Sequence, residues 1–157
     1  RHDWPKALRA KGFDPQQRTD WLAEGLLMYL PADAQDRLFE NITALSAPGS
    51  RLAVETAAEE PVDRREQMRA RMERIASQFG LEKALDVAQL MYDDPDRADV
   101  PEWLTGHGWR TEWVSAPDEM RRLDRFVAAA MPPGDDADAA DLDDTAFSKV
   151  VTAERPS

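Results

Sequence analysis

Residues 19–31 read TDWLAEGLLMYLP, and the short apolar stretch that ends at Glu24 decides the expected fold. A continuous apolar run bounded by turn residues is typical of a strand buried on both faces, and such strands belong to parallel sheets covered by helices. We therefore predict a strand at residues 20–23 and an α/β fold. Glu24 falls at the carboxyl end of this strand, which is where open α/β sheets bind ligands, and Gly25 allows a sharp turn or a close approach to a ligand.

An acidic group at that edge suits a cationic amine. The alternative is that Glu24 is only the first solvated residue after a strand, as acidic side chains often are. The sequence around Glu24 leaves both interpretations open.

The rest of the chain alternates between helical and extended patterns. Helix and strand signals predict helices at residues 4–11, 31–45, 62–79, 100–105 and 117–126, and further strands at 51–56, 109–115 and 147–154. The helix that opens at 31–33 is expected to cover the sheet with a stripe of Ala34, Leu38, Ile42 and Leu45. A strand, a helix and a second strand in succession predict a parallel crossover.

Three other segments carry a specific expectation. The helix at 62–79 has an apolar stripe with arginines on its other faces, which we interpret as core packing rather than as a membrane or partner surface. Residues 128–144 are rich in Pro, Gly, Ala and Asp and are expected to be a mobile connector. Trp109, Thr111 and Trp113 alternate, which predicts one half-buried side of a strand.

Composition excludes several classes of protein. The net charge of −11 argues against binding to nucleic-acid phosphates. Cysteine is absent, so disulfides and thiolate metal sites are excluded. No apolar run approaches the length of a membrane span, and residues 1–5 do not resemble a signal peptide, so we expect no membrane partner and a cytoplasmic location. The length of 157 residues and the 42% hydrophobic content fit one domain.

The acidic run at residues 93–99 raises the question of a metal site, because hard cations prefer clustered carboxylates. Counted from Asp94, however, the run lacks the glycine at position six and the glutamate at position twelve of a calcium loop. We predict an acidic turn before a helix and no metal site. His107 lies between two glycines and is expected in a surface turn.

A family resemblance rests on the stretch Glu24–Leu30, followed by Pro31 and a helix that contains Gln35, Arg37 and Leu38. This segment resembles the one after the fourth strand of methyltransferases that use S-adenosylmethionine. The most similar group is the leucine carboxyl methyltransferase-like family of bacterial methyltransferases. Further segments resemble that family in the same order, namely residues 3–14, 108–110 and 147–156.

The resemblance covers only the C-terminal half of the family. The family's glycine-rich cofactor loop, its ribose-binding acid and its adenine-contacting Asp-Leu pair would all precede Arg1. The resemblance therefore implies that residues 1–157 are a partial methyltransferase domain with a Rossmann-like sheet, in which parallel strands are followed by an antiparallel pair.

The implied activity is methyl transfer from S-adenosylmethionine to a carboxylate or another small-molecule oxygen. By resemblance, Glu24 would bind the cofactor's ammonium group beside Gly25, and Tyr29 is a candidate for the pocket wall, with core packing as the alternative. No catalytic residue is assigned, because such transfers depend on proximity and alignment rather than on a base.

Three classes of function remain open at this point. The chain is a methyltransferase part whose other half lies elsewhere, a noncatalytic remnant, or an interaction module that uses an uncovered sheet edge. We expect the isolated chain to be inactive, and to self-associate through that edge or to be poorly stable.

Overall fold

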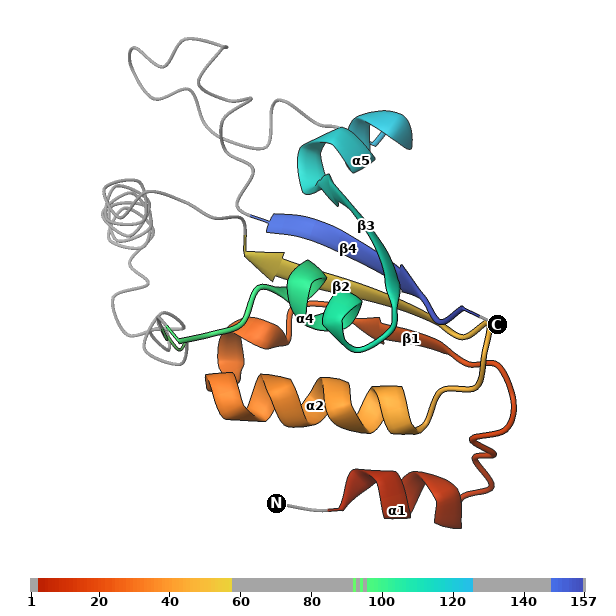
Figure 1. Ribbon diagram of the computed structural model, residues 1–157. Coiled ribbons are helices and arrows are strands. Elements are labelled where there is room, and N and C mark those ends of the chain that lie inside the picture. Colours follow the sequence, from red (N-terminus) through yellow and green to blue (C-terminus); the bar gives the residue numbers. More distant parts are fainter. Residues whose placement is uncertain (1–2, 58–91, 93, 95, 126–147, 157) are drawn as a thin grey trace, which may run out of the picture.

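The computed structural model describes residues 3–57, 92, 94, 96–125 and 148–156. The elements in these ranges, shown in Figure 1, are α1 (Trp4–Ala10), β1 (Asp20–Ala23), the one-turn 3-10 helix η1 (Leu27–Tyr29), α2 (Ala32–Ala44), β2 (Arg51–Ala57), α4 (Val100–Gly106), β3 (Arg110–Ser115), α5 (Ala116–Arg122) and β4 (Ser148–Glu154). The helix expected at 62–79 and the connector expected at 128–144 lie outside the described residues.

The four strands form one open mixed sheet in the order β1-β2-β4-β3. β1 and β2 are parallel, with Ala23 opposite Val54, and this confirms the predicted crossover. β4 lies between β2 and β3 and is antiparallel to both, so the expected antiparallel pair is present. The result is an α/β fold with a small sheet that is compatible with part of a methyltransferase-like domain.

Helices α2 and α4 pack on one face of the sheet, and α1 lies beyond α2 (Figure 1). The core between them is apolar and closely packed, since Phe39, Val54, Leu104 and Val151 are all fully buried. The ring of Phe39 lies 5.4 Å from that of Trp103, which joins α2 to α4. This single core holds the carboxyl ends of β1 and β2 in place.

The buried face of α2 differs from the predicted stripe. Ile42 and Leu45 are buried as expected, but Gln35 and Phe39 are the most buried residues of the first turns, in place of Ala34 and Leu38. A polar Gln35 was not expected in the core. Its amide nitrogen donates a hydrogen bond to the Ala98 carbonyl, and its amide oxygen accepts one from Arg97, both in the segment before α4. These two hydrogen bonds explain how a polar side chain can be fully buried there.

The prediction that β1 is buried on both faces is wrong. Ala23 is 5% exposed, whereas Leu22 is 72% exposed. Successive side chains of a strand point to opposite faces, and α2 and α4 pack on the face that carries Ala23. Trp113 also differs from the expected half-buried side, because β3 is an outer strand and its indole is 62% exposed next to the ammonium of Lys149.

The helix ends agree with capping rules and correct one predicted boundary. The Asp99 side chain accepts a hydrogen bond from the Glu102 N–H at the start of α4. The helix expected at 117–126 ends already at Arg122, because Asp124 has a φ of 55° that a helix cannot continue. His107 follows α4 at the surface as predicted, with its ring stacked 3.5 Å from that of Trp103.

Candidate functional site

The sharp turn predicted after β1 is present at Gly25, whose φ is 59°. The backbone N–H of Gly25 donates a hydrogen bond of 3.0 Å to Oε2 of Glu55 in β2. Because β1 and β2 are parallel, their carboxyl ends meet at the same edge of the sheet. Glu24 therefore lies at the same edge of the sheet as Glu55, and Glu55 holds the turn that follows Glu24.

The side chain of Glu24 is exposed, and no hydrogen bond or ion pair holds its carboxylate among the described residues. A Cβ atom added to Gly25 would meet nothing within 4 Å, so glycine is favoured there by its backbone angle and not by crowding. The space beside the Glu24–Gly25 turn is open. A ligand with a cationic group can approach it without displacing any of the described residues.

Tyr29 lies at the end of η1, between the Gly25 turn and α2. Its side chain is 37% exposed and is thus not part of the buried core, and Leu26 beside it is 38% exposed. The Tyr92 N–H donates to the Met28 carbonyl at 2.9 Å, which places a second partly exposed tyrosine next to η1. Two partly exposed tyrosines therefore lie on or next to the loop that follows Glu24.

Asp94 and residues 96–99 lie in the predicted acidic turn, but they also contact the loop that contains η1, which the sequence did not indicate. Oδ2 of Asp94 accepts a hydrogen bond of 3.0 Å from the Ala32 N–H at the start of α2. Asp94 also accepts from the Asp96 N–H through Oδ1. Within the described ranges, no three acids or histidines come together as a metal site would require.

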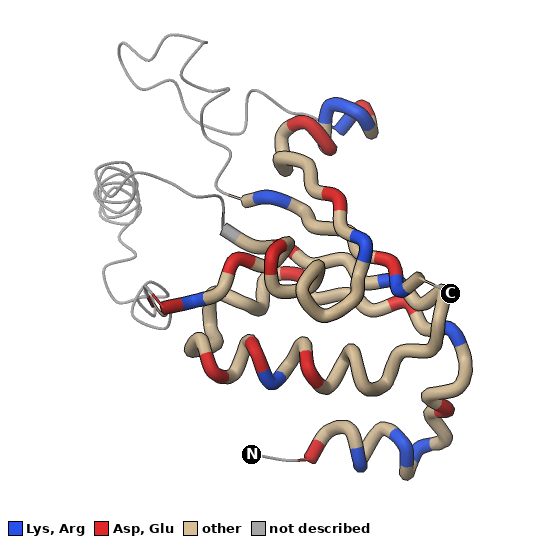
Figure 2. Tube along the Cα trace, viewed as in Figure 1, with Lys and Arg blue, Asp and Glu red and all other residues tan. Residues whose placement is uncertain are grey.

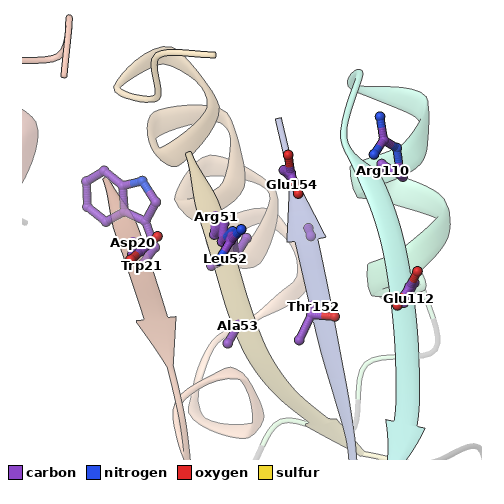
Figure 3. A pocket seen from close by; sticks show the side chains of 10 residues that line it. Asp20, Trp21, Arg51, Leu52, Ala53, Arg110, Glu112, Thr152 and Glu154 are labelled. Atoms are coloured by element: carbon purple, nitrogen blue, oxygen red, sulfur yellow. The ribbon is translucent and has the colours of Figure 1, made fainter. Parts of the chain in front are cut away.

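A shallow hollow of about 470 Å³ lies on the open face of the sheet, away from the Glu24 turn (Figure 3). It sits where β1 and β2 begin, and a row of alternating charges crosses the four strands there, made of Asp20, Arg51, Glu154 and Arg110. Figure 2 shows acidic and basic positions close together at this end of the sheet. Opposite charges on neighbouring strands of this row stabilise the pairing of the strands.

None of the helices in the described part of the chain is both long enough and apolar enough to cross a membrane.

Comparison with known families places the site in a wider context. The family model for leucine carboxyl methyltransferase matches residues 1–43, from before α1 to near the end of α2. The matched segment therefore includes Glu24, Gly25 and Tyr29. The match supports a methyltransferase-like family that uses S-adenosylmethionine. It does not extend to the later segments that resemble the family, at 108–110 and 147–156.

Proposed function

We propose that this chain is the C-terminal half of an S-adenosylmethionine-dependent methyltransferase domain. The observation that carries the proposal is the Gly25 turn bonded to Glu55, which leaves the Glu24 carboxylate exposed at the carboxyl edge of two parallel strands. Ligands of open α/β sheets bind at this edge. The match over residues 1–43 supports the same family from an independent direction.

The residues around the turn suit a cofactor with an amino-acid group. Glu24 would bind its ammonium through a charge-assisted hydrogen bond, and Gly25 leaves room for that group to approach. Tyr29 would form part of the pocket wall. The bound cofactor supplies an electrophilic methyl group, for which we propose a carboxylate or another small-molecule oxygen as acceptor. The chain's own residues bind and align, which is the main contribution that this chemistry needs.

The proposal includes that this chain forms only part of the methyltransferase domain. In the family that the sequence resembles, the glycine-rich loop, the ribose acid and the adenine contacts come from a preceding half. The present chain would then contribute one wall of a shared site. On this view it has no methyltransferase activity when isolated.

The test is cofactor binding by the intact protein that contains this sequence, measured by calorimetry with S-adenosylmethionine. Replacing Glu24 by Gln removes the charge opposite the ammonium and should weaken binding by about tenfold or more. The matched control is Asp96→Asn in the acidic turn, which should change affinity little. Equal effects of the two substitutions, or no binding by the unsubstituted protein, would contradict the proposal.

One observation favours a second function, which is self-association. β1 is an outer strand of the described sheet, and it carries Leu22 with 72% of its surface exposed. An outer strand with an exposed apolar residue is a template for pairing with another chain. We propose that the isolated chain associates through this strand.

A further inference from the structure

The guanidinium of Arg97 lies against the Gly25–Leu30 loop, which carries part of the proposed cofactor site. Nη1 donates hydrogen bonds of 3.0 Å to the Leu27 carbonyl and to Oε1 of Gln35. Nη2 donates to the Leu30 carbonyl, and it lies 3.5 Å from the Tyr92 carbonyl. One side chain thus bonds both ends of η1 and the first turns of α2, although it lies 62 residues after Gln35 in the sequence.

Gln35 has its amide oxygen held toward Arg97 by a second hydrogen bond. Its side chain is fully buried, and its Nε2 donates a hydrogen bond of 2.9 Å to the Ala98 carbonyl. The amide therefore has one possible orientation, with its oxygen toward Arg97. The Asp94–Ala32 and Tyr92–Met28 hydrogen bonds connect the same two segments on either side.

Arg97 donates to the Leu30 carbonyl, and it gives the Leu27 carbonyl a second, charged donor beside the Leu30 N–H. A helix as short as η1 has few internal hydrogen bonds of its own, namely those from the Tyr29 and Leu30 N–H groups. Backbone oxygens in a partly buried position cost free energy when they are unpaired, and hydrogen bonds from a charged donor are stronger than neutral ones. The position of η1, and with it that of Tyr29, therefore depends on Arg97.

We propose that Arg97, oriented by Gln35, is a positioning residue for the cofactor site, because it holds the Gly25–Leu30 loop in its binding conformation. This inference rests on the proposed function. Arg97 acts through the loop, and it is not proposed to touch the cofactor. The acidic run before α4 thus serves the site through its one arginine.

The first arm of the test measures the loop without any ligand. In this chain, Arg97→Ala should speed amide hydrogen exchange at Tyr29 and Leu30 by about tenfold, as expected for the loss of hydrogen bonds to a charged group. Exchange at Val54 and Val151, in the centre of the sheet, should stay unchanged. Arg97→Lys should fall in between, and millimolar guanidinium should partly restore slow exchange to the alanine variant.

Arg37→Ala is the matched control, because Arg37 lies on α2 but pairs with Asp33 at the surface. It should alter neither loop nor sheet amides. The proposal is overturned if Arg97→Ala leaves Tyr29 and Leu30 unchanged, or if it speeds exchange equally in the sheet, which would indicate a general loss of stability.

The second arm measures S-adenosylmethionine affinity in the intact protein, where Arg97→Ala should weaken binding by about tenfold. Unchanged affinity in a variant with a loosened loop would overturn the positioning role. Absence of binding by the unsubstituted protein would instead refute the proposed function, and the exchange arm would still decide whether Arg97 holds the loop.

Discussion

The backbone N–H of Gly25 and the carboxylate of Glu55 lie 3.0 Å apart and join two strand ends that are 30 residues apart in the sequence. A carboxylate that accepts from a backbone N–H makes a stronger hydrogen bond than a neutral acceptor. The turn that exposes Glu24 is therefore held from β2 as well as by its own backbone. The first prediction concerns this bond.

Glu55→Ala should loosen the Gly25 turn, whereas Glu55→Gln keeps an oxygen acceptor and should have a smaller effect. We expect faster amide exchange at Gly25 in the alanine variant, by about tenfold for a charge-assisted bond. Hydrogen exchange followed by NMR measures this directly. An alanine variant whose Gly25 amide exchanges as slowly as in the unsubstituted chain would mean that the contact does not hold the turn.

The isolated chain should bind S-adenosylmethionine weakly or not at all. A single carboxylate contact contributes about 1.5–3 kcal/mol, and micromolar affinity requires about 8 kcal/mol. Calorimetry on the 157-residue chain tests this expectation. Low-micromolar affinity would show that residues outside Glu24, Gly25 and Tyr29 already complete a cofactor site within this chain.

The isolated chain should also self-associate through β1. The charge of −11 opposes association only in part, because salt screens it beyond about 8–10 Å. Leu22→Lys should shift the chain toward monomer in analytical sedimentation, since lysine protects strand edges. Leu123→Lys, at an exposed position beyond α5, is the control and should not. A monodisperse unsubstituted monomer with a sharp melt above about 60 °C would contradict the prediction.

The corrected face of α2 gives a prediction about stability. Phe39 is fully buried between the sheet and Trp103, so Phe39→Ala should reduce the free energy of unfolding by about 3–5 kcal/mol. Leu38→Ala, at a partly buried neighbour, should cost clearly less. Urea denaturation of the two variants measures the difference. The reverse order would support the stripe that the sequence predicted.

Acid should weaken the start of α5. The hydrogen bond from Ser115, with a further contribution from Arg121, lowers the pKa of Asp118 below its ordinary value of 3.8. A depressed pKa in the folded state stabilises the fold at pH values above 3.8, and this contribution is lost as the pH falls through the folded pKa. NMR titration should show the lowered pKa, and Ser115→Ala should raise it. An unchanged pKa in that variant would assign the shift to another cause.

Local sequence patterns were sufficient to predict most of the helices and strands. The strand at residues 20–23 and the starts of the helices at 4, 32 and 100 follow from short apolar runs and capping residues, and the structure has them. The antiparallel pairing of β3 with β4 came from the family resemblance and not from periodicity. The exposure of Leu22 could not be predicted in this way, because it depends on which face of the sheet the helices cover.

The site was predictable only in part for a similar reason. Glu24 and Gly25 stand out in the sequence because they follow a strand directly. Arg97 and Gln35 are 62 residues apart, and nothing in their local surroundings indicates that they meet. A polar residue on the apolar face of α2 was the one available signal, since a buried Gln35 requires a partner.

The central place of β4 in the sheet also affects how the chain folds during its synthesis. Ser148–Glu154 pairs with both β2 and β3. β2 therefore gains its second neighbouring strand only after Glu154, the partner of Arg51, has been synthesised. During synthesis the ribosome delivers β1, β2 and β3 before this central strand, so in the nascent chain neither β2 nor β3 yet has the β4 neighbour that it has in the folded sheet. Pairings between residues so distant in sequence form slowly, and open edges invite aggregation or chaperones in the meantime. The yield of folded chain should therefore depend on how quickly translation reaches residue 154.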